Sequence, residues 1–148
     1  MPDDLINDEL VAERIAQQRI SRLPDTTSPE PPVALRALID YASVQMWLDG
    51  LRQHWGGDPV TVDPDRLPML EAFCVYANRD PDQMIKETTM LKDGEKRIRT
   101  KGRERYSHLI DEWQATVEGS RIRKGKAGNT VRSFLIHNGV LLASGMQG

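Results

Sequence analysis

Hydrophobic residues recur along most of this chain at the three- and four-residue spacing of an amphipathic α-helix. The spacing predicts helices over residues 5–22, 33–55, about 95–118 and about 128–138, and two more that begin at Pro64 and Pro81. Two-residue alternation, which is typical of a strand, occurs only in the short segment 59–62. We therefore expect an all-α fold, a bundle of four to five helices with an N-terminal arm.

The bundle is expected to span residues 33–142, between an acidic arm over residues 1–32 and a short tail over residues 143–148. The arm ends in PDTTSPEPP, whose prolines cannot donate helix hydrogen bonds and therefore indicate a linker. The apolar positions of residues 5–22 are sparse, which leaves two options. The arm is either a helix that makes subunit contacts or a disordered acidic extension.

Local signals mark the ends of the predicted helices, and each helix has an apolar face. Asp63 and Asp80 each precede a proline, as an N-cap precedes the first helical residue, and Gln83 could close a capping box on Asp80. Asn138 and Gly139 form a stop signal. The predicted core positions are Leu35, Leu38, Ile39, Ala42, Met46, Leu67, Leu70, Phe73, Cys74, Ala77, Met84, Ile85, Leu91, Ile98, Gly102, Tyr106, Leu109, Ile110, Trp113, Val117, Val131, Phe134 and Leu135.

The distribution of charge is more informative than the net charge of −2. Residues 1–91 hold 8 basic and 16 acidic side chains, a net charge of −8, whereas residues 92–148 hold 12 basic and 6 acidic ones, a net charge of +6. Opposite charge in the two parts indicates a basic working surface in the second part.

Two segments concentrate this positive charge. Seven cations lie within residues 92–105, where Arg97, Lys101 and Arg105 are four residues apart and form one stripe on the predicted helix. A basic loop expected over residues 119–128 adds four more. Such an arrangement suits docking on the phosphates or in the major groove of DNA, and a merely solvated helix face is the alternative. The predicted DNA-binding residues are Lys96, Arg97, Arg99, Thr100, Lys101, Arg103, Arg105, Ser107, Arg121, Arg123, Lys124, Lys126, Asn129 and Arg132.

The sequence contains no enzyme signal. The three histidines lack zinc-site spacing, Cys74 lies on an apolar face, and no phosphate-binding loop, dinucleotide motif or serine-hydrolase motif occurs. We therefore expect no metal, no other cofactor and no small-molecule substrate. No apolar run approaches the roughly 18 residues that span a bilayer, and the acidic start lacks a signal-peptide core. The expected location is the cytoplasm, with no membrane partner.

Four motifs follow one another in an informative order: LEAFC at residues 70–74, DPDQMI at 80–85, YSHLI at 106–110 on a basic helix, and NTVRSFLIHNGVLL at 129–142. In this order, from about residue 43 to residue 142, the chain resembles the N-terminal core-binding domain of tyrosine recombinases, the SAM-like domain of phage-type integrases. The closing motif, R-S-F-x-x-H-N-G-x-L, is the most specific of the four.

The resemblance implies a four-helix domain that forms half of a clamp around recombination-site DNA, with basic helices in adjacent major grooves. The catalytic domain of that family carries Arg, Lys, His-x-x-Arg, His and a tyrosine nucleophile. None of Tyr41, Tyr76 and Tyr106 lies in that context, and Tyr106 is expected in the core or at the DNA edge. The resemblance therefore implies that this chain binds duplex DNA without cleaving it, with a homo-oligomer on the DNA as a further candidate assembly.

A helical protein–protein interaction module is the alternative function. The acidic and basic parts of the chain could pair head to tail in an oligomer, and the predicted helix over residues 33–55 could offer its apolar surface to a partner helix.

Overall fold

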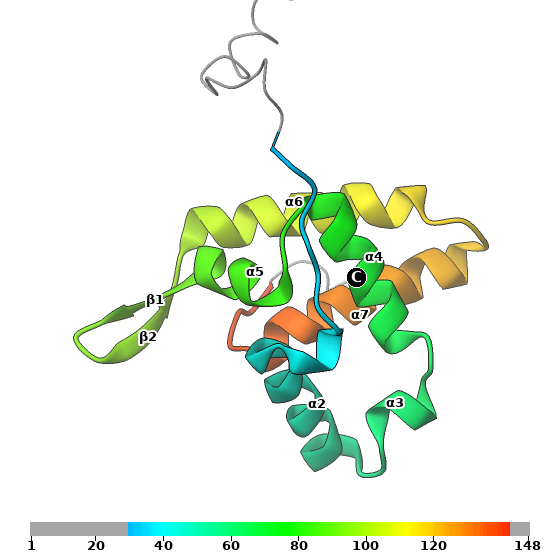
Figure 1. Ribbon diagram of the computed structural model, residues 1–148, viewed down its shortest axis with the longest axis horizontal. Helices are drawn as coiled ribbons and strands as arrows, with labels where there is room; N and C mark the ends of the chain where they lie inside the picture. Colours follow the sequence, from blue (N-terminus) through cyan, green and yellow to red (C-terminus); the bar gives the residue numbers. More distant parts are fainter. Residues whose placement is uncertain (1–29, 143–148) are drawn as a thin grey trace, which may run out of the picture. The chain divides into compact units, whose positions relative to one another are not determined.

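The computed structural model describes residues 30–142, and contacts within the chain divide it into two units, Met1–Pro32 and Val33–Gly148. The helix expected over residues 5–22 and the tail lie outside the described residues. The second unit is mostly helical, as predicted, but it also contains one two-stranded sheet (Figure 1). Its elements are η2 (Leu38–Asp40), α2 (Ala42–Trp55), α3 (Pro59–Val62), α4 (Arg66–Ala77), α5 (Pro81–Thr88), β1 (Thr89–Lys92), β2 (Glu95–Ile98), α6 (Thr100–Thr116) and α7 (Arg121–His137).

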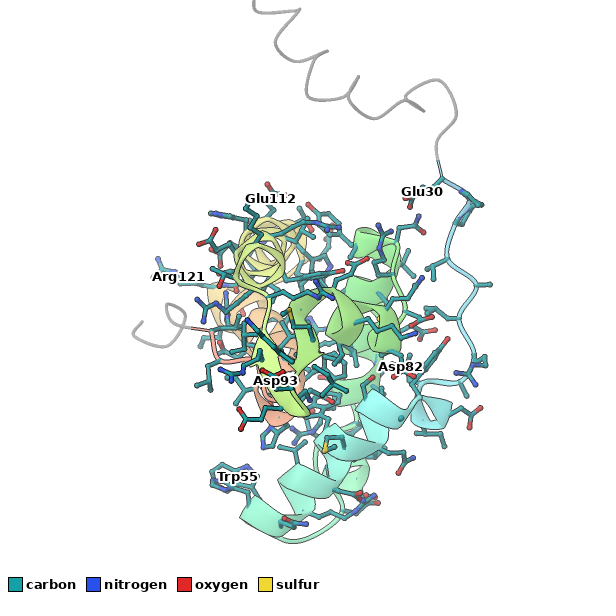
Figure 2. The ribbon with its side chains drawn as sticks, turned by 90° about the vertical axis from the view of Figure 1, so that its left-hand side faces the viewer. Glu30, Trp55, Asp82, Asp93, Glu112 and Arg121 are labelled. Carbon is teal, nitrogen blue, oxygen red and sulfur yellow. The ribbon has the colours of Figure 1, made fainter. Side chains whose placement is uncertain are left out.

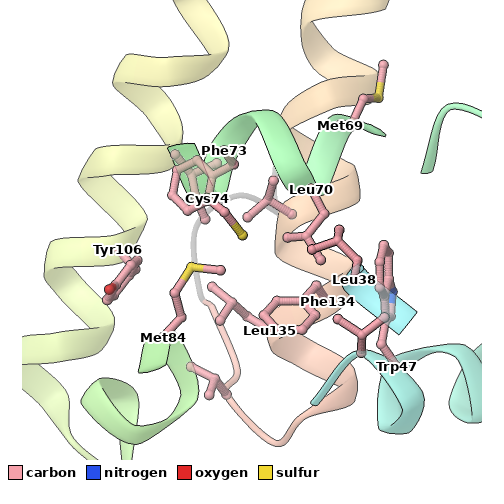
Figure 3. Packing of buried hydrophobic residues seen from close by; sticks show 14 of the residues in the cluster. Leu38, Trp47, Met69, Leu70, Phe73, Cys74, Met84, Tyr106, Phe134 and Leu135 are labelled. Carbon is pink, nitrogen blue, oxygen red and sulfur yellow. The ribbon is translucent and has the colours of Figure 1, made fainter. Parts of the chain in front are cut away.

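Helix α7 packs against α2, α4 and α6, and its side chains Val131, Phe134 and Leu135 are fully buried, as their spacing predicts. The edge of the Trp47 ring on α2 meets the Phe134 ring, with 5.7 Å between the ring centroids (Figure 3). The Trp47 indole N–H donates a hydrogen bond to Ser133 Oγ over 3.0 Å. Full burial of a side chain such as Phe134 contributes roughly 1.5–3 kcal/mol, so this contact holds α2 on α7.

Most predicted core positions of α4, α5 and α6 are confirmed. The ring of Phe73 lies 5.3 Å from that of Trp113 and 6.4 Å from that of Tyr106, centroid to centroid, and all three side chains are buried. Leu67, Ala77, Ile85, Leu109 and Val117 are partly buried against the core. The fully or almost fully buried side chains among the predicted positions of these helices are Leu70, Phe73, Cys74, Met84, Tyr106, Ile110 and Trp113.

One of the two predicted aspartate–proline helix starts is confirmed and the other is wrong. Asp80 and Gln83 form the predicted capping box, in which each side chain accepts the backbone N–H of the other over 2.8 Å. Helix α4 instead begins at Arg66, two residues after Pro64, without a side-chain cap. A second aspartate–proline helix start forms at Asp58 and Pro59, where the Asp58 carboxylate accepts the N–H of Val60. The segment expected to resemble a strand is therefore the short helix α3.

The helix predicted over residues 33–55 begins only at Ala42, because Tyr41 before it is extended, with φ −88° and ψ 135°. The extended segment before it is anchored to the domain, since the Val33 N–H donates to Asn78 Oδ1 over 2.6 Å. Leu38 is buried, but Ile39 and Met46 are about half exposed, at 48% and 52%. The face of α2 that packs on the core differs from the predicted one and consists of Ser43, Val44, Trp47, Leu48 and Leu51.

The helix predicted over about 95–118 is wrong at its start, because β1 and β2 form an antiparallel hairpin there. Asp93 and Gly94 at its tip have φ of 54° and 79°, the positive values that a two-residue hairpin turn requires and that this dipeptide favours. The hairpin projects from the helices in Figure 1. Leu91 on β1 is consequently 76% exposed rather than part of the core.

The basic loop predicted over residues 119–128 is the first half of helix α7. Ser120 caps this helix by accepting the N–H of Arg123 over 3.1 Å. Gly128 is a buried residue of this helix rather than a loop residue, and its missing side chain leaves room for Gln114 of α6. The helix ends before Asn138 and Gly139, as predicted, and Gly139 has φ 92°.

Two glycine substitutions test how closely α6 approaches α5. A Cβ at Gly102 would lie 1.9 Å from the backbone O of Glu87, so we expect Gly102→Ala to lower the free energy of unfolding by about 1–3 kcal/mol. Gly125 on α7 has no such neighbour within 4 Å, and Gly125→Ala should raise the free energy of unfolding by about 0.4–1 kcal/mol. Urea unfolding of both variants measures the difference, and equal effects would contradict the close approach of α6 to α5.

Candidate nucleic-acid interface

The predicted DNA-binding residues are spread over three elements. Lys96 and Arg97 lie on β2, Arg99 to Ser107 lie at the start of α6, and the remaining residues lie on α7. The predicted stripe of Arg97, Lys101 and Arg105 is therefore wrong, because Arg97 belongs to a strand and only the other two share a face of α6. Arg97 pairs instead with Glu95 on its own strand over 2.9 Å, where both side chains are mostly exposed.

Several predicted cations are ion-paired with carboxylates of the acidic part of the chain. Lys126 Nζ lies 3.0 Å from Asp63 Oδ1 and 3.3 Å from Asp65 Oδ2, and Arg123 lies 3.6 Å from Asp65. Burial raises the pKa of Asp63, but hydrogen bonds from Lys126 and from the Asp65 N–H outweigh it and lower that pKa. Asp63, the expected cap of α4, and its neighbour Asp65 thus anchor the first turns of α7.

Other predicted cations bind backbone carbonyl groups. Lys96 Nζ donates to the Asn138 carbonyl over 2.9 Å, and Arg99 Nε donates to the Thr89 carbonyl over 2.9 Å. Lys124 Nζ donates to the Ala115 carbonyl over 3.0 Å at the end of α6, where carbonyls lack helix partners. These three side chains therefore hold the ends of structural elements together.

Arg105 belongs to a cluster around Glu87 at the end of α5. Glu87 accepts hydrogen bonds from the Tyr106 hydroxyl and from Arg79 Nε, and Arg105 lies 3.8 Å from the same carboxylate. Burial raises the pKa of Glu87, but these donors outweigh it and hold that pKa below its usual 4.5. Burial and the Glu87 carboxylate raise the pKa of Tyr106, whose side chain is fully buried. Of the two predicted positions for Tyr106, the structure places it in the core.

Lys101, Arg103 and Arg121 remain available, since they form no ion pair or side-chain hydrogen bond with any residue of 30–142. Lys101 and Arg121 are exposed, and Thr100, the neighbour of Lys101 at the start of α6, is exposed as well. Arg103 and Ser107 are half-buried and share one face of α6 with Asp111, which contacts α7. Arg103 and Arg121 therefore lie near opposite ends of α7.

Arg132 and Asn129 form an ordered polar group on the outer face of α7. The Arg132 guanidinium donates to Asp111 over 2.8 Å, to Gln114 over 3.0 Å and to Asn129 Oδ1 over 3.0 Å. The Arg132 side chain is only 13% exposed. It therefore orients Asn129, which is exposed, rather than reaching far into solvent itself.

A hollow of about 460 Å³ lies beside this group, between the end of α2 and α7. Trp55, His54 and His137 help to line it together with Asn129 and Arg132. Figure 2 shows Trp55 and Arg121 on one side of the domain and Asp82 on the other. Sequence reasoning missed Trp55, whose only signal is an aromatic residue at the end of a helix, next to Gly56 and off the apolar face.

The described residues show neither a metal-binding cluster nor a membrane-spanning helix, and their one cysteine lies in the core. Residues 30–142 contain no group of three His, Cys, Asp or Glu side chains suited to a metal, and none of their helices could cross a membrane. Burial, with Asp80 and Glu71 nearby, raises the pKa of Cys74 to about 12, which leaves an inert thiol in the core, as predicted. Comparisons of the chain with protein-family models, with curated proteins and with solved structures found no match.

The Glu87 cluster makes stability depend on pH. A carboxylate whose pKa is lower in the folded than in the unfolded protein stabilises the fold when the pH is above the unfolded pKa. This stabilisation is lost as the pH falls through the pKa of the folded protein. We expect Glu87→Gln to lower the free energy of unfolding by roughly 1–2 kcal/mol at pH 7. The difference from the unsubstituted protein should shrink below pH 4.5.

Urea unfolding at a series of pH values measures this dependence. The exposed Glu71 provides a matched control, because Glu71→Gln should change stability by less than about 0.5 kcal/mol at every pH. A Glu87→Gln effect that is constant between pH 7 and pH 3 would contradict the role of the ionised carboxylate.

Proposed function

We propose that this chain is a duplex-DNA-binding domain of the kind found in tyrosine recombinases, and that it grips DNA through α7. The observation that carries the proposal is the charge of this helix. Its 17 residues include five cations and no carboxylate. An α-helix fits the major groove of B-DNA, and a helix that carries no acidic side chain of its own adds no repulsion toward the phosphates there.

The positions of the available groups support this use of α7. Arg121 and Arg103 lie near its two ends, where cations can bind phosphates on either side of a groove. Asn129 lies between them on the exposed face, where an amide can reach base edges. Lys101 and Thr100 extend the same basic region along the start of α6.

The internal ion pairs favour DNA binding over the alternative interaction module. That alternative requires the acidic part of one molecule to pair with the basic part of another. Within one molecule Asp63, Asp65 and Glu87 already pair with Lys126, Arg123 and Arg105. Fewer opposite charges therefore remain for association between copies, whereas Arg103 and Arg121 remain open to an anionic ligand.

The proposal predicts salt-dependent binding to duplex DNA. The logarithm of the association constant should fall linearly with the logarithm of salt concentration, by about 0.9 per phosphate contact. The double variant Arg103→Gln and Arg121→Gln loses two such contacts, so its slope should be shallower by about 2 and its affinity at low salt at least about tenfold lower. Fluorescence anisotropy of a labelled duplex measures both quantities.

The matched control removes two cations from another surface. Arg36 before η2 and Lys86 on α5 are exposed, and the double variant Arg36→Gln and Lys86→Gln has the same net charge as the test variant. It should bind DNA as the unsubstituted chain does. Equal losses in the two double variants would assign binding to net charge and reject the face proposed here.

A further inference from the structure

Trp55 is the tryptophan that the core does not use. Of the three tryptophans in the chain, Trp47 and Trp113 are buried, whereas Trp55 is 75% exposed at the end of α2. Its ring and the His54 ring are nearly perpendicular, at 81°, with 4.7 Å between their centroids. An exposed indole beside a concave surface is typical of a binding site rather than of a folding core.

The hollow next to Trp55 has an apolar wall and a polar wall. Leu51, Trp55 and Ile136 supply the apolar wall, and Asn129 and Arg132 on α7 supply the polar one. The residues that line it include no carboxylate. The hollow is continuous with the exposed face of α7, so an anionic ligand on that helix would also cover it.

Asn129 offers hydrogen-bond donors to this hollow. Its Oδ1 accepts a hydrogen bond from Arg132 over 3.0 Å, and the contacts of Arg132 with Asp111 and Gln114 keep that acceptor occupied. The Nδ2 group has no hydrogen-bond partner among residues 30–142. The hollow therefore presents an amide donor next to an apolar surface.

We propose that this hollow is a subsite for the major-groove edge of thymine. Thymine presents the O4 acceptor and, beside it, the C5 methyl group, and no other base of DNA has this pair. The Asn129 amide donates to O4, and the methyl group packs on the Trp55 indole. Cytosine is disfavoured because its N4 donors would face the Asn129 donors. The inference rests on the proposed function and adds a base-reading element to it.

The test compares two duplexes that differ only in the methyl group. One is an alternating adenine–thymine duplex, and the other contains deoxyuridine at every thymine position, so charge and O4 are unchanged. We expect the protein to bind the thymine duplex about three- to fivefold more tightly, the gain from burying one methyl group, with equal salt slopes. Trp55→Ala should bind the two duplexes equally, again with an unchanged salt slope, because an apolar contact releases no counterions.

Leu91→Ala is the matched control, because Leu91 is also exposed, at 76%, but lies on the hairpin. It should keep the preference for thymine, and circular dichroism of each variant verifies folding. Equal binding of the two duplexes by the unsubstituted protein, or a preference that survives in Trp55→Ala, would overturn the subsite. If duplex binding nevertheless weakens in the Arg103 and Arg121 double variant, the DNA-binding proposal stands and only the thymine subsite is rejected.

Two further outcomes separate the proposals. Absence of salt-dependent binding to either duplex would reject the proposed function and the subsite together. A second copy of the chain is the competing occupant of the hollow. Sedimentation that shows a dimer without DNA, lost in Trp55→Ala but kept in Leu91→Ala, would assign the hollow to self-association and overturn the thymine subsite.

Discussion

The packing of α7 against α2, α4 and α6 is the constraint on which the rest of the domain depends. Gly50 permits the approach of α2 to α7, since a Cβ there would lie 2.6 Å from His137 Cδ2, and Gly128 on α7 leaves room for the Gln114 side chain of α6. Neighbouring helices cover most of α7, so its remaining outer face carries the exposed side chains. Folding thus selects which residues of this helix can meet a ligand.

The same constraint divides the basic residues into two groups. Lys124 and Lys126 face the neighbouring elements and bind a helix-end carbonyl or a carboxylate, and Arg132 orients Asn129. Exposed ion pairs of this kind contribute little stability, at most about 1 kcal/mol, so their main effect is to fix the position of the α7 start. Arg103 and Arg121 make no such contacts within residues 30–142 and define the proposed phosphate contacts. A count of cations along the sequence does not distinguish these groups.

The sequence predicts helical packing well where periodicity is strong. Phe73, Tyr106 and Phe134 are buried as expected, and the capping box of Asp80 and Gln83 forms. Prediction failed where local chemistry competed with periodicity. The Asp93–Gly94 turn converts part of an expected helix into a hairpin. Gly125 and Gly128 make the first half of α7 look like a loop, because glycine is common in loops, although both residues are helical. The site residues are predicted by type, but their partners are not, because the pairing of Asp63 with Lys126 depends on long-range packing.

The central claim, that the outer face of α7 meets duplex DNA, is tested most directly by NMR titration of the labelled protein with a short duplex. We expect the largest shift changes at Arg121, Asn129 and the Trp55 indole N–H. The exposed side of α4, around Val75 and Tyr76, should change little. Changes centred on Val75 and Tyr76, or no changes at saturating duplex, would contradict the account.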